Sequence, residues 1–146
     1  MIKVASAAFK NGEIIPKKYT CDGENINPPL TIASIPAEAK SLALIVDDPD
    51  APVGNWNHWL VWNIEPATKE ISENSVPANT VLGINDFGKL EYGGPCPPSG
   101  THRYFFRIYA LDTKLDLPQG AKRGELENAM KNHIVDQGEL MGKYSR

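Results

Sequence analysis

The sequence has only two cysteines, Cys21 and Cys96, no hydrophobic run long enough to cross a bilayer, and no Lys/Arg-rich run. Two cysteines do not form a disulfide scaffold, so the fold must depend on a hydrophobic core. The net charge of −3 and the dispersed basic residues argue against nucleic acid as a partner. The opening MIKVASAAF lacks the sustained apolar segment of a signal peptide. We therefore expect a cytoplasmic protein with no transmembrane segment and two free thiols. A disulfide between the two cysteines is the alternative.

A chain of 146 residues, 41% of them hydrophobic, predicts one domain over residues 1–146 with a sizeable core. Short apolar runs alternate with turn clusters rich in Gly, Pro, Asn and Asp, which is typical of an all-β sandwich or barrel. The expected strands are Leu42–Val46, His58–Ile64, Thr80–Ile84 and Tyr104–Leu111.

One segment has a different period. Leu126, Met130 and Ile134 recur every four residues, which predicts an amphipathic helix from Gly124 to Ile134. Gly138 then follows as a candidate C-cap, and the tail Glu139–Tyr144 is a candidate strand.

Polar residues stand at two strand ends. The first apolar run is followed by Asp47-Asp48-Pro49-Asp50. Because burying carboxylates is costly, we expect these acids to lie at the mouth of the buried strand. The next strand opens with His58, which alternation places on one face with Leu60 and Trp62. Taken separately, these features also fit a surface turn and a histidine at the edge of the core.

The stretch GGPCPPSGTHRYFF places a stiff loop, poor in backbone donors, directly before a strand that carries His102 and Tyr104. If the two regions meet, two imidazoles, a phenol and Asp48 surround one cavity. Protonated imidazoles and a phenol are hydrogen-bond donors, and a nearby acid favours the protonated imidazole. We therefore predict a pocket that binds phosphate-type anions more weakly as the pH rises through the histidine pKa. We also predict that the His102→Ala variant loses most of the affinity.

The motifs DDPDAP, HWLVWN and YGGPCPPSGTHRYFFRIYALD, together with YTCDGENINPPL near the N-terminus, resemble the phosphatidylethanolamine-binding protein family. The similarity is to its short bacterial and archaeal branch, which includes Raf kinase inhibitor-like proteins. It implies two antiparallel sheets in a Greek-key β-sandwich with one C-terminal helix. It also implies a pocket for a phosphate or a phospholipid head group. By position, the implied ligand-binding residues are Asp48, Pro49, His58, Gly94, Cys96, Pro98, His102 and Tyr104.

The sequence departs from the eukaryotic members of that family. Pro95-Cys96 stands where they have a glycine-containing wall, and we expect this short chain to lack their C-terminal extension. The resemblance implies no enzyme activity and no cofactor, and it makes a kinase or a protease a candidate regulated partner. Homodimerisation is a further expectation from related short proteins.

Three other interpretations stay open. A cysteine-dependent hydrolase would use Cys96, His102 and Asp48 as nucleophile, base and orienting acid, although Pro97 and Pro98 supply no N–H for an oxyanion hole. A metal site would use His58, His102 and Asp48. A protein-interaction domain would present a surface loop such as Lys69–Asn79.

Overall fold

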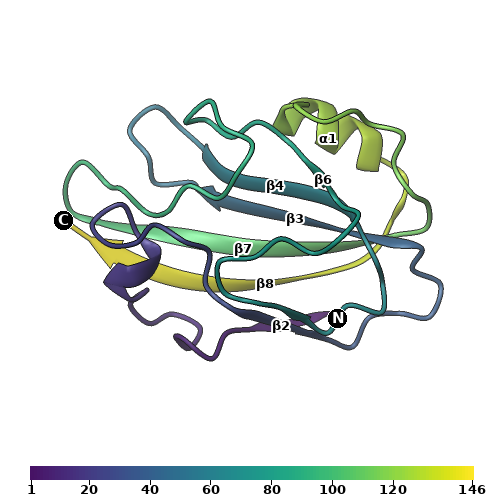
Figure 1. Ribbon diagram of the computed structural model, residues 1–146, viewed down its shortest axis with the longest axis horizontal. Coiled ribbons are helices and arrows are strands. Elements are labelled where there is room, and N and C mark those ends of the chain that lie inside the picture. The colour runs from purple at the N-terminus through teal and green to yellow at the C-terminus, as the bar shows by residue number, and fades with distance from the viewer.

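The computed structural model describes residues 1–146 and consists of two antiparallel β-sheets and one α-helix (Figure 1). The larger sheet has the strand order β6-β4-β3-β7-β8, and the smaller sheet has the order β1-β2-β5. The predicted all-β Greek-key sandwich with a helix near the C-terminal end is confirmed. No helix in the structure has the length and apolar character needed to cross a membrane. The elements are β1 Lys3–Ala5, the 3-10 turn η1 Lys17–Tyr19, β2 Leu30–Ala33, β3 Ser41–Asp48, β4 Trp56–Ile64, β5 Glu70–Ile71, β6 Val81–Leu82, β7 Thr101–Leu111, α1 Arg123–Met130 and β8 Ile134–Ser145.

The central strand β3 is buried on both faces, which explains its continuous apolar run. Leu42, Leu44 and Val46 belong to the core between the two sheets, whereas Ala43 and Ile45 belong to a second core that includes residues of α1. In Figure 1, α1 and the small sheet accordingly lie on opposite sides of the large sheet. The large sheet therefore has a helix-facing side and a side that faces the small sheet.

The predicted helix is four residues too long at its C-terminal end. It ends at Met130, and Asn132 follows with a left-handed backbone (φ 70°) that turns the chain into β8. Gly138 is not a C-cap, because it lies within β8 opposite Ile108. A Cβ at Gly138 would overlap the carbonyl oxygen of Ile2, so this glycine lets the N-terminal segment pack directly on β8. The predicted tail strand is confirmed as part of β8.

A β-bulge at His58 changes which residues of β4 face the same way. Val46 pairs with Trp59 and Asp47 pairs with Asn57, so His58 is the extra residue without a partner on β3. Leu60 and Trp62 pack in the helix-facing core, whereas His58 contacts Tyr104 on the other side, with ring centroids 5.3 Å apart. The expectation that His58 shares a face with Leu60 and Trp62 is therefore wrong, because strict alternation is interrupted at the bulge.

Candidate functional site

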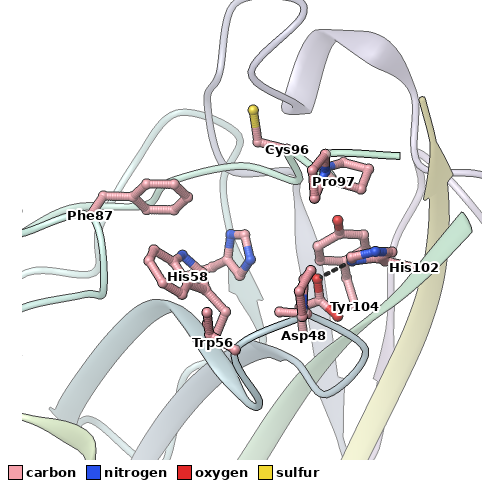
Figure 2. Close-up of a pocket in the computed structure, with 12 residues that line it drawn as sticks. Asp48, Trp56, His58, Phe87, Cys96, Pro97, His102 and Tyr104 are labelled. Carbon is pink, nitrogen blue, oxygen red and sulfur yellow. Dashed lines mark hydrogen bonds and ion pairs between the residues drawn. The ribbon is translucent and has the colours of Figure 1, made fainter. Parts of the chain in front are cut away.

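A cavity of about 290 Å³ lies where the end of β3 meets the beginnings of β4 and β7 (Figure 2). Both β4 and β7 run antiparallel to β3, so this register brings residues far apart in sequence to one edge. Six of the eight candidate site residues line the cavity: Asp48, His58, Cys96, Pro98, His102 and Tyr104. The other two, Pro49 and Gly94, lie outside its lining.

Asp48 and His102 form a buried pair at the cavity. His102 Nδ1 lies 2.6 Å from Asp48 Oδ2, and the two residues are 7% and 3% exposed. The other carboxylate oxygen, Oδ1, accepts the backbone N–H of Asp50 at 2.7 Å. Asp48 thus orients the imidazole of His102 and also holds the turn that follows β3. Because Nδ1 of His102 is engaged by Asp48, Nε2 is the ring nitrogen that is free for a ligand.

His58 lies on the side of Tyr104 opposite to His102, where a backbone carbonyl holds it (Figure 2). Its Nδ1 lies 2.7 Å from the carbonyl oxygen of Gly93, and because a carbonyl can only accept, Nδ1 carries the proton. Burial lowers the pKa of His58 below its ordinary value of 6.5, so the ring is neutral near pH 7. A neutral ring protonated on Nδ1 offers Nε2 as an acceptor. The assumption that both imidazoles act as charged donors near neutral pH therefore fails for His58.

The Tyr104 hydroxyl is buried without a hydrogen-bond partner, and the whole residue is 1% exposed. Burial raises the pKa of this phenol, and the negative charge of Asp48 raises it further. Tyr104 is therefore a neutral O–H donor at physiological pH. Leaving a buried hydroxyl unpaired costs about 1–3 kcal/mol, which an acceptor group on a ligand would offset.

The Cys96 wall of the cavity is covalently fixed. A disulfide joins Cys96 to Cys21, so the expectation of free thiols is wrong. The bonded sulfur has no thiolate, which removes the nucleophile that the hydrolase interpretation requires. The geometric cause is that the loop after η1 packs against this wall: the Cys21 N–H donates to the carbonyl of Pro95 at 3.1 Å.

Gly94 supports the wall from outside the cavity. Its N–H donates to Asn25 Oδ1 at 2.7 Å, and a Cβ at this position would overlap the carbonyl oxygen of Tyr19. The absence of a side chain thus serves packing between two loops. Gly94 therefore supports the wall without lining the cavity, and a direct contact with a ligand stays a prediction.

Apolar residues that sequence reasoning did not single out complete the lining. Trp56 and Phe87 stand edge to face with ring centroids 5.6 Å apart, and Phe87 also contacts His58 at 5.3 Å. Phe87 and Val53 are 42% and 79% exposed, so they border the mouth of the cavity. Alternation along β4 could have identified Trp56 from its spacing to His58, but Phe87 sits in a turn and carries no such signal. The remaining apolar lining residues are Ala51, Pro52 and Pro97, of which Pro97 lies in the stiff loop that the sequence had already indicated as a wall.

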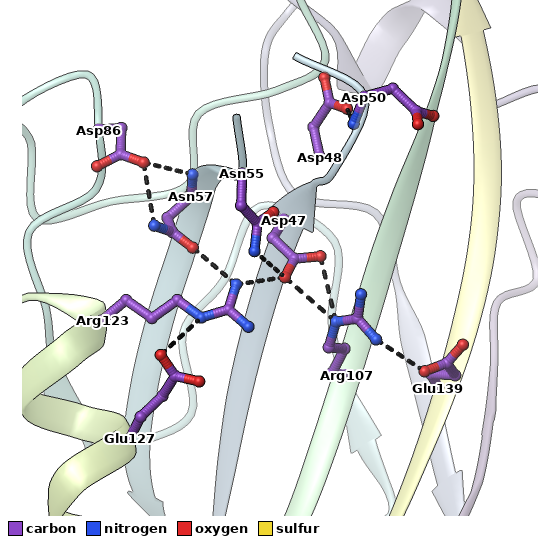
Figure 3. Close-up of polar contacts among 10 residues, drawn as sticks. All are labelled: Asp47, Asp48, Asp50, Asn55, Asn57, Asp86, Arg107, Arg123, Glu127 and Glu139. Carbon is purple, nitrogen blue, oxygen red and sulfur yellow. Dashed lines mark hydrogen bonds and ion pairs between the residues drawn. The ribbon is translucent and has the colours of Figure 1, made fainter. Parts of the chain in front are cut away.

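The neighbouring acid, Asp47, faces the helix and is fully buried. It accepts from Nε of Arg107, 3.2 Å from each carboxylate oxygen, and from Arg123 of α1 (Figure 3). Arg123 also donates to Asn57 Oδ1 at 2.9 Å. These contacts bind α1 to the paired residues Asp47 and Asn57, each of which directly precedes a cavity residue.

A third group of contacts fixes the turn after β3. The guanidinium of Arg103 makes two hydrogen bonds of 2.9 Å to the carboxylate of Asp50, and the Arg103 N–H adds a third at 3.0 Å. These bonds lower the pKa of Asp50 to about 2. The turn that borders the cavity is therefore tied to the start of β7.

No group of three or more His, Cys, Asp or Glu residues in the structure is arranged to hold a metal ion. The three proposed ligands do not form such a set. Asp48 and His102 engage each other, while His58 is tied to a backbone carbonyl.

Comparison with known proteins decides the family. The family model "Phosphatidylethanolamine-binding protein" matches residues 5–145. This chain belongs to the phosphatidylethanolamine-binding protein family. It is 53% identical to a UPF0098 protein of Methanothermobacter thermautotrophicus, over 95% of each chain, and 52% identical to the UPF0098 protein of Pyrococcus abyssi, over 100% of this chain and 86% of that one.

Two solved structures share the fold of this family member. The Chlamydia trachomatis protein CT736, described as a homologue of the phosphatidylethanolamine-binding proteins, has a TM-score of 0.95 and 43% identity over 99% of this chain and 97% of its own. The Escherichia coli protein YbcL, described as a new member of the mammalian family, has a TM-score of 0.93 and 30% identity over 99% and 98%. The similarity thus extends across the whole described fold.

Proposed function

We propose that this protein binds a small phosphorylated ligand, either a free phosphate ester or the head group of a phospholipid, without transforming it. The observation that carries the proposal is the convergence of the Asp48–His102 pair, neutral His58 and the unpartnered Tyr104 hydroxyl on one cavity. Membership of a family described as phosphatidylethanolamine-binding supports the same ligand class.

The polar groups of the cavity suit a ligand that both accepts and donates hydrogen bonds. The Tyr104 O–H is a donor for a phosphate oxygen, whereas neutral His58 is an acceptor for a phosphate hydroxyl or an ammonium group. A phosphate ester that carries one proton, or that carries a nearby amine, supplies both. Val53, Trp56 and Phe87 at the mouth suit the carbon portion of such an ester.

Three features favour binding over catalysis. The sulfur of Cys96 is in a disulfide, and no serine or threonine lines the cavity beside the Asp48–His102 pair. The raised pKa of Tyr104 keeps its phenol neutral, so it is a poor nucleophile at physiological pH. The Asp48–His102 pair can then orient a ligand, but it has no side-chain nucleophile in the cavity to activate.

Calorimetric titration with O-phosphoethanolamine at pH 7 tests this proposal. Tyr104→Phe removes one hydroxyl from a buried site, so we expect binding at least tenfold weaker, since a hydrogen bond to a charged group is worth about 1.5–3 kcal/mol. His102→Ala should lose more, because it also leaves Asp48 unpaired. Phosphorus NMR should show the ligand unchanged after prolonged incubation.

His133→Ala is the matched control, because His133 is an exposed histidine that pairs with Asp112 away from the cavity. It should bind as the unmodified protein does. Ethanolamine and methyl phosphate, titrated separately, distinguish recognition of the amine from recognition of the phosphate. Equal affinity in Tyr104→Phe, or no heat of binding for any of these ligands, would refute the proposal.

A further inference from the structure

The wall of the cavity around Cys96 has few non-covalent attachments of its own. Pro95, Pro97 and Pro98 have no N–H, and residues 96–99 make no backbone–backbone hydrogen bond. The only backbone bond of Pro95 is the one its carbonyl accepts from Cys21. This segment is therefore positioned mainly by its ends and by the disulfide.

Both ends of the segment are well fixed. On the N-terminal side, the Tyr92 hydroxyl donates to the carbonyl of Tyr19 at 2.8 Å and Gly94 donates to Asn25. On the C-terminal side, Gly100 and Arg146 exchange backbone hydrogen bonds of 2.9 and 3.1 Å. Between these anchors, the wall is held by the Cys21–Cys96 disulfide, by the Cys21 N–H bond to Pro95 and by a 3.5 Å contact from Arg146 Nη1 to Cys96 Sγ, and only the disulfide is covalent.

The partner loop around Cys21 is itself anchored to the end of β8. The Tyr144 hydroxyl donates to Asp22 Oδ2 at 2.7 Å, and Arg146 lies 3.3 Å from the other carboxylate oxygen. Cys21 and Cys96 lie 75 residues apart in sequence, so the disulfide joins the wall to a firmly held but distant segment. Both cysteines are only half-buried, which leaves the bond open to attack by an external thiol.

We propose that the Cys21–Cys96 disulfide is a redox clamp on the ligand cavity, and that its reduction by a dithiol loosens the wall and weakens ligand binding. A thiolate of the dithiol attacks one sulfur and displaces the other. The second thiol of the dithiol then attacks the mixed disulfide and closes a cyclic disulfide. Two electrons pass from the dithiol to the protein, and two protons complete the thiols of Cys21 and Cys96. The ligand part of this proposal rests on the proposed function, whereas the loosening of the wall does not.

Hydrogen exchange followed by mass spectrometry, with and without dithiothreitol, tests the loosening directly. Peptides that cover residues 17–25 contain the Cys21 N–H, which is bonded to the carbonyl of Pro95, so they should exchange faster once the wall loosens on reduction, while peptides from β3 and β7 keep their protection. Unchanged exchange at residues 17–25 contradicts the clamp. So does an equal increase throughout β3 and β7, because the bond would then support the whole fold and not the wall.

Ligand binding supplies the second measurement, with O-phosphoethanolamine as the probe. The reduced protein should bind it about tenfold more weakly or worse, since at least one wall residue must then be ordered on binding. If the oxidised protein binds no probe, the proposed function fails while the exchange data still decide the clamp. If oxidised and reduced protein bind equally, the clamp fails and the proposed function stands.

A paired Cys21→Ser/Cys96→Ser variant is the redox-insensitive control. Its affinity should match that of the reduced protein and should not respond to dithiothreitol. A response to the reductant in this variant would show that the effect does not pass through the disulfide, and would overturn the proposal.

Discussion

Asp47→Asn is the sharpest test of the packing beneath the site, because it removes one charge and keeps the shape of the side chain. The carboxyl of Asp47 is fully buried and accepts from Arg107, Arg123 and the side chain of Asn55. An amide cannot accept at both positions, so it would point a donor at one guanidinium and leave both cations without their shared counter-charge.

The expected loss follows from the burial of the three partners. Removing one member of a buried ion pair costs about 3–5 kcal/mol, because the other charge is left uncompensated. The side chains of Arg107 and Arg123 keep 24% and 16% of their surface exposed, so water reaches both. We therefore expect the lower end, about 3 kcal/mol of unfolding free energy. For a domain of this size that lowers the melting temperature by roughly 6–12 °C.

Urea denaturation at pH 7 measures this loss. Glu139→Gln is the matched control: Glu139 also pairs with Arg107, at 2.9 Å, but its side chain is 51% exposed. An exposed pair contributes about 0–1 kcal/mol, so this variant should be nearly neutral. Adding Arg123→Met to Asp47→Asn removes one of the two guanidinium groups that lose the charge of Asp47, and should recover part of the stability. A loss below about 1 kcal/mol in Asp47→Asn would show that the buried carboxyl does not anchor α1 to the sheet.

Two further predictions concern pH and packing. Because burial lowers the pKa of His58, the unfolded chain binds more protons than the folded chain below pH 6.5. Stability should therefore fall as the pH drops from 6.5 toward the folded pKa, by at most about 1.4 kcal/mol per pH unit. Urea unfolding at several pH values should show that the free energy of unfolding depends less on pH in His58→Gln than in the unmodified protein. Gly138→Ala should lower the free energy of unfolding by about 1–3 kcal/mol, because the added Cβ would overlap the carbonyl oxygen of Ile2. Thermal unfolding measures this loss. Gly124→Ala is the control and should not destabilise the protein, because a Cβ there meets open space.

The layered fold was predictable because the pattern of apolar residues in β3 and β7 indicates which of their side chains are buried. Leu42–Val46 is apolar throughout, and its strand is buried on both faces. In Thr101–Leu111, the buried residues His102, Tyr104 and Phe106 alternate with more exposed ones, as expected for a strand with one face toward the core. The end of the helix was not predictable from periodicity. Ile134 continues the four-residue spacing, yet Asn132 adopts a left-handed turn and places Ile134 at the start of β8.

The polar residues that line the cavity were predictable from the sequence, but their protonation states and covalent bonds were not. The polar strand ends identified Asp48, His58, His102 and Tyr104, and antiparallel pairing brings them to one cavity. The neutral state of His58 depends on burial and on the Gly93 carbonyl, neither of which a local pattern reveals. The pairing of Cys21 with Cys96 depends on the packing of two loops 75 residues apart, which two isolated cysteines cannot indicate.

The consecutive acids at the end of β3 connect these observations. Alternation sends Asp47 to the helix layer and Asp48 to the cavity, so adjacent peptide units are held from opposite sides of the sheet. The same arrangement recurs across the strand pair, where Asn57 contacts Arg123 and the bulge turns the next residue, His58, toward Tyr104. Without the bulge, alternation would place His58 opposite to Trp59 and direct it toward α1. The anchoring of α1 and the geometry of the cavity are therefore set by the same two pairs of neighbouring residues, and a change on the helix side should be transmitted to the cavity through the backbone alone.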